Sequence, residues 1–72
     1  MQRLLSKMYL VECYLKGDGD PFKRIQFDTE DEARQYAKQM RETKAYSHIE
    51  VLDVWYDPRG YLSPYKSVID VF

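Results

Sequence analysis

The segment DTEDEARQYAKQM, residues 28–40, contains the strongest local signal in the chain. Thr29 and Glu32 have the spacing of a capping box, in which each side chain satisfies a backbone N–H that the first helical turn leaves unpaired. Acidic residues open the segment and basic residues follow toward its end, an arrangement that the helix dipole favours. The pattern therefore predicts one helix over residues 29–44.

One narrow apolar stripe runs along this helix. Its members recur at positions i, i+3, i+4 and i+7, and they are Ala33, Tyr36, Ala37 and Met40. The two alanines have small side chains, which allow the helix backbone to come close to a sheet. We therefore expect the stripe to pack against strands.

Two segments before the helix alternate in the manner of β-strands. The first, residues 8–16, is followed by the turn-forming sequence GDGDP at residues 17–21 and by a short returning strand at residues 22–27. One face of the first strand is wholly apolar or aromatic, and we expect it to face the core together with Ile25 and Phe27 of the second strand. These inward residues are Tyr9, Val11, Cys13, Leu15, Ile25 and Phe27.

The longest expected strand, residues 48–56, has two conflicting faces. Ile49, Val51, Asp53 and Trp55 share one side, and Leu52, Val54 and Tyr56 share the other. Two explanations remain open. Either a bulge changes the phase near Val51 and Leu52, or this is a central strand with both faces partly covered.

The chain after this strand predicts a turn and a final strand. DPRG at residues 57–60 fits a type I turn, and residues 66–72 form the last expected strand, with Ile69 and Val71 on one face. Pro64 cannot donate a hydrogen bond within a sheet, so the segment before this strand is a kink, a bulge or an edge.

The element order β-β-α-β-β predicts a two-layer α+β fold. One helix would pack on one face of a four-stranded, mostly antiparallel sheet and leave the other face open to water or to a partner. The 72 residues form a single domain, residues 1–72. Because the strand pattern begins only at Met8, we expect residues 1–7 to be a flexible tail.

The chain is short for a protein without an internal cross-link. A domain of this size buries only roughly 60% of its unfolded surface. Cys13 is the only cysteine and His48 the only histidine, so neither an internal disulfide nor a Cys/His zinc site is available. This favours stabilisation by a partner protein or by a second copy of the chain, as in a homodimer.

The residues that resemble parts of known catalytic and metal sites are better explained by other roles, which argues against an enzyme. Asp18 and Asp20 resemble part of a cation loop, but the further ligands of an EF-hand are missing, so turn formation is the better interpretation. Cys13 and His48 are a conceivable nucleophile and base, yet Cys13 lies on an inward strand face. We predict no enzymatic activity, no cofactor and no metal.

Charge and hydropathy limit the compartments in which the protein is expected and the kinds of partner that it is expected to bind. No apolar run approaches the ~20 residues of a membrane span, and the N-terminus lacks the features of a secretory signal, so we expect a cytoplasmic protein. The basic residues are scattered and the net charge is −1, which argues against nucleic acid. Residues 45–72 contain only Arg59 and Lys66 against four acidic residues, Glu50, Asp53, Asp57 and Asp70.

The aromatic residues are the best indication of a binding surface. Seven Tyr, three Phe and one Trp exceed what one small core requires. Sheet propensity alone is one explanation, and a binding surface is the other, since Tyr, Trp and Arg dominate interface energetics. We expect Trp55 in the core with Ile49 and Val51. The predicted partner-binding residues are Arg59, Tyr61, Tyr65, Tyr14 and Tyr56.

Residues 9–56 contain an aromatic strand, a second strand, the helix start TEDEARQYA and a further strand, in that order. This layout is similar to that of the small host-RNA-polymerase inhibitor of T7-like phages. The chain departs from this layout by adding DPRGYLSPYKSVIDVF. The resemblance implies a compact inhibitor that binds a host protein, encoded by a phage or mobile element. The alternative is a nucleic-acid-associated accessory protein that uses a Tyr-rich sheet face.

Overall fold

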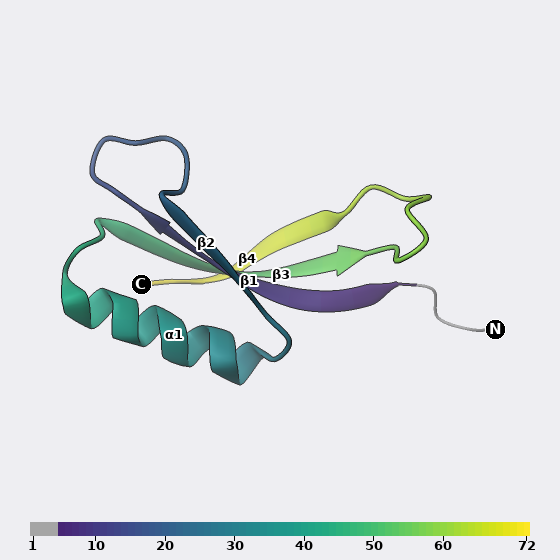
Figure 1. Ribbon diagram of the computed structural model, residues 1–72, viewed down its shortest axis with the longest axis horizontal. Helices are drawn as coiled ribbons and strands as arrows, with labels where there is room; N and C mark the ends of the chain where they lie inside the picture. The colour runs from purple at the N-terminus through teal and green to yellow at the C-terminus, as the bar shows by residue number, and fades with distance from the viewer. Residues whose placement is uncertain (1–4) are drawn as a thin grey trace.

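The computed structural model describes residues 5–72 and confirms the α+β class, with one helix packed against a four-stranded antiparallel sheet (Figure 1). The elements in chain order are β1 (Ser6–Tyr14), β2 (Lys23–Phe27), α1 (Glu30–Thr43), β3 (His48–Tyr56) and β4 (Tyr65–Val71). The strand order is β2-β1-β3-β4, so β1 and β3 are the central strands. All three strand pairs are antiparallel.

The cap at the N-terminus of α1 is the one that its sequence predicts, and a residue in the left-handed conformation caps its C-terminus. The Thr29 side chain accepts the N–H of Glu32 at 3.3 Å. The reciprocal bond differs from the expected one, because the Glu32 carboxylate accepts the Thr29 hydroxyl at 3.0 Å. Lys44 ends the helix in the left-handed conformation, with φ of 58°, and donates its N–H to the Arg41 carbonyl.

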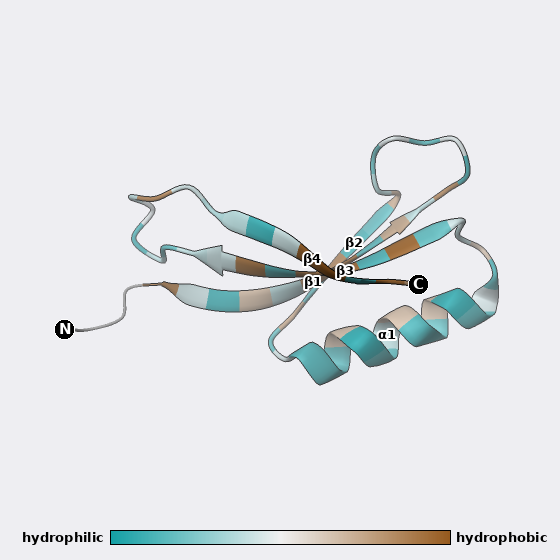
Figure 2. Cartoon of the chain, turned by 180° about the vertical axis from the view of Figure 1, so that it is seen from behind, coloured by the Kyte–Doolittle hydropathy of each residue, from teal (hydrophilic) through white to brown (hydrophobic). Residues whose placement is uncertain are grey.

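The main core lies between α1 and the sheet. The expected stripe faces the strands: Ala33 and Ala37 are fully buried, and Tyr36 and Met40 pack against the same cluster. Figure 2 shows hydrophobic colour where the strands cross and mainly hydrophilic colour along the helix. The sheet residues in this cluster are Val11, Cys13, Ile49 and Val51, and we call their side of the sheet the helix-side face.

A second buried cluster lies on the opposite side, which we call the open face. It contains Leu10, Leu52 and Val54, with Met8 packed against them. Leu10 is paired with Leu52 across β1 and β3. β3 is therefore a central strand with both faces covered in part, which resolves the conflict in its sequence pattern.

The bulge is in β4 and not in β3. Val51 pairs with Asp70 and Leu52 pairs with Val68, which leaves Ile69 as the extra residue. Ile69 consequently packs on the main core, whereas Val71 moves to the open face and is exposed. The prediction that Ile69 and Val71 share a face is wrong, because an inserted residue reverses the alternation that follows it.

Asp70 joins β4 to the helix and occupies part of the outer edge of the sheet. One carboxylate oxygen pairs with Arg34 of α1, and the other accepts the backbone N–H of Val71 at 2.8 Å. Arg34 also pairs with Glu30, at 2.6 Å. The last strand is thus tied to the helix by charged side chains on the surface.

β1 begins earlier than the alternation suggests. Ser6 and Lys7 pair with Tyr56 and Trp55 of β3, so the expected tail of residues 1–7 is wrong for these two residues. Residues 1–4 lie outside the part that the structure describes.

The molecule is elongated, with extents of 46 × 24 × 15 Å. Its radius of gyration is 13.5 Å, whereas a compact chain of this length has a radius of about 11 Å. The excess arises because α1 covers only one end of the sheet, and β1, β3 and β4 continue beyond it (Figure 1). We call this extension, residues 6–9 and 53–67, the arm.

Candidate functional site

A buried carboxylate organises the loop at the end of the arm. The Asp57 carbonyl accepts the N–H of Gly60 at 2.9 Å, which confirms the predicted turn at residues 57–60. The Asp57 side chain is fully buried and accepts three more backbone N–H groups. They belong to Arg59 at 2.9 Å, Tyr61 at 3.1 Å and Leu62 at 3.2 Å. We call residues 57–65 the corner.

These bonds also change the chemistry of the Asp57 carboxyl. The N–H of Arg59, assisted by those of Tyr61 and Leu62 and by the Arg59 charge, holds the pKa of Asp57 below its ordinary value of 3.8. Burial acts in the opposite direction and is outweighed. The carboxylate therefore remains charged near neutral pH and holds the loop in one conformation.

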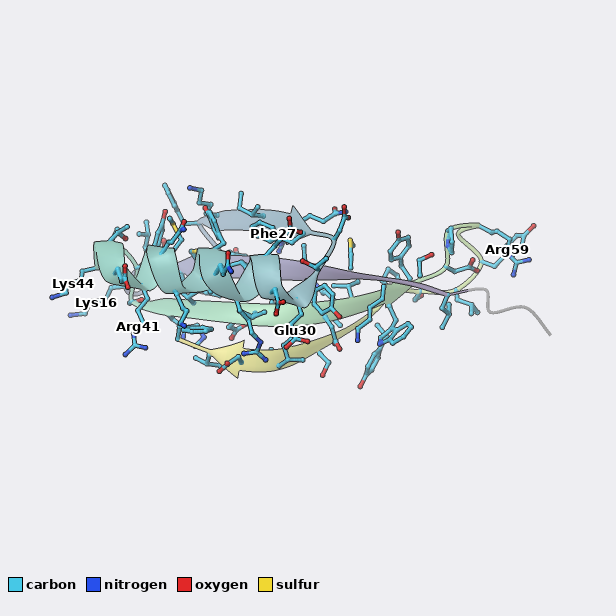
Figure 3. All side chains as sticks on the ribbon, turned by 90° about the horizontal axis from the view of Figure 1, so that it is seen from below. Lys16, Phe27, Glu30, Arg41, Lys44 and Arg59 are labelled. Carbon is cyan, nitrogen blue, oxygen red and sulfur yellow. The ribbon has the colours of Figure 1, made fainter. Side chains whose placement is uncertain are left out.

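The corner exposes large side chains although its backbone is fixed. Tyr61 is 79% exposed, Leu62 61% and Tyr65 66%. The Arg59 guanidinium lies 5.1 Å from the centroid of the Tyr61 ring. Figure 3 shows Arg59 projecting from the tip of the arm. The structure thus brings Arg59 and Tyr61 together, as the sequence predicts, and adds Leu62.

The two remaining predicted residues lie elsewhere. Tyr56 ends β3 opposite Ser6, on the open face of the arm. Tyr14 is at the other end of β1, opposite His48, which places it roughly 30 Å from the corner at the usual rise of about 3.3 Å per residue. The five predicted residues therefore do not form one continuous surface.

Tyr14 belongs instead to a group of polar residues at its own end of the open face. Its hydroxyl donates to the buried Glu12 carboxylate at 3.1 Å, which also accepts Arg24 Nε at 2.7 Å. Glu50 lies opposite Glu12 and is 2.8 Å from His48 Nε2. Burial, followed by the charge of Glu12, raises the pKa of Tyr14. Every member of this group has a partner within the chain, which is typical of a structural network.

Trp55 does not lie in the main core, contrary to its predicted place. It is half-buried on the helix-side face of the arm, beyond the end of the helix. Lys7 lies opposite it in β1, with Nζ 5.0 Å from the Trp55 ring and 5.3 Å from the Tyr9 ring. The same ammonium is 3.6 Å from Asp53 Oδ2. The Tyr9 side chain, assisted by the Asp53 carboxylate, raises the pKa of Lys7 above 10.5.

Cys13 and His48 do not form a nucleophile and base. Cys13 is fully buried against the helix, and His48 points to the open face because it pairs with Tyr14. Burial raises the pKa of the Cys13 thiol, which disfavours the reactive thiolate. Among residues 5–72, no three His, Cys, Asp or Glu side chains come close enough to hold a metal ion.

The charged residues exposed on the arm differ in sign from the acidic balance of residues 45–72 in the sequence. Asp57 is buried in the corner and Asp53 is paired with Lys7, while Glu50 and Asp70 belong to the body of the sheet. The exposed charged residues of the arm are cations: Lys7, Arg59 and Lys66. The acidic balance expected for residues 45–72 is therefore not present on the exposed surface of the arm.

A shallow hollow lies at the opposite end of the molecule. It is lined by Lys38, Arg41, Glu42 and Lys44 at the C-terminus of α1, and Figure 3 shows Lys16 at the same end. Cations at this end of a helix compensate its dipole, so their presence is explained without a ligand.

Sequence reasoning missed several side chains of the arm. Leu62 lies in a segment without a regular strand pattern, and Lys7 lies in the segment expected to be a tail. Asp53 did give a signal, because it is a charged residue in an otherwise apolar strand face.

Comparison of the chain with family models, curated proteins and solved structures gives no match. Within residues 5–72, no helix has the length and apolar character needed to cross a bilayer.

Proposed function

We propose that this chain is a non-catalytic protein-binding module that covers a surface of another protein with its corner. One observation supports this most directly: the buried Asp57 fixes the corner backbone while Tyr61, Leu62 and Tyr65 remain exposed. A loop that is already ordered loses little conformational entropy when a partner binds. Tyr and Arg are also the residue types that most often anchor interfaces.

The biological setting of the proposal comes from the resemblance described above. A layout similar to that of the small RNA-polymerase inhibitor of T7-like phages supports an inhibitor that is encoded by a phage or mobile element. Such a protein would act in the cytoplasm by blocking a host protein. The partner is recognised through a surface that is both apolar and complementary to Arg59.

The test is affinity capture from the source cell with the parent chain and with the triple variant Arg59→Ala/Tyr61→Ala/Tyr65→Ala. Interface anchors of these types commonly cost about 2 kcal/mol or more each when truncated. We therefore expect the triple variant to lose its captured partner. Its melting temperature should change little, because exposed substitutions usually alter stability by about ±0.5 kcal/mol.

Phe22→Ala provides the matched control. Phe22 is another exposed aromatic residue, but it lies in the loop between β1 and β2, at the opposite end of the molecule from the corner. This variant should capture as much partner as the parent. If the triple variant unfolds, or captures as much partner as the parent, the corner is a structural feature and the proposal is wrong.

A nucleic-acid-associated function is the second candidate, and one observation favours it. The exposed charged residues of the arm are cations, and they lie among exposed tyrosines, as in surfaces that stack on single-stranded nucleic acid. Nuclease treatment before capture separates the two candidates. A partner protein that survives nuclease supports the first, and loss of all captured material supports the second.

A further inference from the structure

Four side chains on the helix-side face of the arm form a compact block. Lys7 lies directly opposite Trp55, and Tyr9 lies directly opposite Asp53. The Lys7 ammonium is within 5.3 Å of both ring centroids and 3.6 Å from Asp53 Oδ2. The block is therefore a cation held between two aromatic rings and a carboxylate.

The Asp53 carboxylate is only partly satisfied by this arrangement. Its side chain is 17% exposed, and Oδ2 has the long contact with Lys7. Oδ1 is buried and has no hydrogen-bond partner, and it is the one such side-chain atom within residues 5–72. Buried polar atoms in native proteins usually have a partner, so this oxygen indicates a hydrogen-bond donor that residues 5–72 do not supply.

We propose that Tyr9, Asp53 and Trp55 form a binding site for the alkylammonium group of a partner's lysine side chain, and that Lys7 occupies this site in the free chain. The rings supply cation–π attraction, which acts on a positive charge within about 6 Å of the ring centroid. Asp53 Oδ1 accepts an N–H of the incoming ammonium. An anionic ligand is excluded by the carboxylate.

Lys7 is suited to be a displaceable occupant. Its side chain is 35% exposed and has a flexible stem, so it can move into water when another ammonium enters. A free amine must compete with a cation that is covalently attached nearby, which is present at a high effective concentration. Binding to the parent chain is thus weak unless the partner contributes other contacts, and removal of Lys7 should reveal the site.

The site does not depend on the proposed role of the corner. It lies on a different set of residues and is tested with a small amine and the purified chain, without a captured partner. A negative result in the amine titration leaves the corner intact, and a negative capture result leaves the amine site intact.

The experiment is a titration with n-butylammonium chloride at constant ionic strength, followed by fluorescence. Trp55 is the only tryptophan in the chain, so its emission reports directly on the site. We expect Lys7→Ala to bind the amine at least tenfold more tightly than the parent does. The amine should also raise the melting temperature of Lys7→Ala, because a ligand that binds the folded state stabilises it.

Three controls make the result specific. Lys66→Ala removes a cation from the open face of the arm, since Lys66 pairs with Val54, and should behave as the parent. Adding Asp53→Asn to Lys7→Ala should remove the gain in affinity. Tetramethylammonium, which has no N–H, should bind Lys7→Ala more weakly than butylammonium does.

The proposal is overturned if folded Lys7→Ala gives no saturable response, or if the response is unchanged by Asp53→Asn. Equal binding of tetramethylammonium would remove the role given to Asp53 Oδ1. Should Lys7→Ala fail to fold, Lys7→Thr retains a residue with high strand propensity and leaves the ammonium position empty. The same criteria then apply to that variant.

Discussion

Asp57 determines the conformation of the corner by accepting hydrogen bonds from residues within the turn and directly after it. Its position as the first residue of a type I turn was evident from DPRG, because Asp commonly occupies that position. Its bonds to Tyr61 and Leu62 extend past the turn and order the segment that follows. The exposed side chains of the corner therefore depend on a residue that no partner would touch.

Replacement of Asp57 by Asn should destabilise the chain in a pH-dependent manner. The folded pKa of Asp57 lies below its ordinary value of 3.8, so the charged carboxylate stabilises the fold at pH values above 3.8. This contribution is lost as the pH falls from 3.8 through the lower folded pKa. The difference in unfolding free energy between the parent and Asp57→Asn should be constant from pH 7 to about pH 4 and shrink below it.

Urea unfolding of both chains at a series of pH values measures this difference. Asp28→Asn, at an exposed position before the helix, serves as the control substitution. A parent–variant difference that stays the same down to pH 2, or that grows as the pH falls, would show that the Asp57 charge does not stabilise the corner.

At the level of elements, the contact between α1 and the sheet depends on two alanines. Ala33 and Ala37 are the buried residues of the helix, and both are fully buried. Their size sets the distance between the two layers. The contact is therefore sensitive to any increase in volume or charge at these positions.

Ala37→Asp should destabilise the chain by roughly 3 kcal/mol or more, because it buries a carboxylate without a partner. Thermal and urea unfolding measure the change. Gln39→Asp introduces the same side chain and the same charge change on the exposed side of the helix, and it should alter stability by about 0.5 kcal/mol or less. A well-folded Ala37→Asp variant as stable as Gln39→Asp would contradict the observed orientation of the helix.

The elements themselves were largely predictable, and the deviations have a common cause. The capping box located α1, and alternation located β3 at its observed bounds, because both signals are local. The bulge at Ile69 was not predictable, since an extra residue is defined only by its pairing partner in β3. The same is true of Lys7, which becomes part of a strand only because Trp55 lies opposite it.

At the level of the whole molecule, the large apolar residues that are exposed within residues 5–72 lie in three separate places. Tyr61, Leu62 and Tyr65 are at the corner, Val68 and Val71 are exposed on the open face of β4, and Phe22 lies alone in the loop between β1 and β2. A short chain without a cross-link gains most from covering such residues with a second copy. We expect a twofold-symmetric homodimer in which the open faces meet.

Sedimentation at micromolar concentration should give a species of about twice 8.7 kDa. The double variant Val68→Lys/Val71→Lys should shift this species to the monomer without loss of fold, whereas Leu62→Lys should not. A strict 8.7 kDa species for the parent chain would exclude the homodimer. Dissociation by Leu62→Lys alone would place the contact at the corner.

The bulge in β4 has a consequence for solubility at high concentration. The sequence SVIDVF, residues 67–72, is rich in strand-forming residues and sits on the outermost strand, where another chain could add to the sheet and begin a fibre. The extra residue at Ile69 interrupts the regular spacing of the outer backbone groups, and Asp70 occupies the N–H of Val71. An approaching strand therefore meets an irregular, partly occupied row of hydrogen-bonding groups. This edge of the sheet is therefore a poor template for open-ended strand addition, while the open face and the corner remain available for specific contacts.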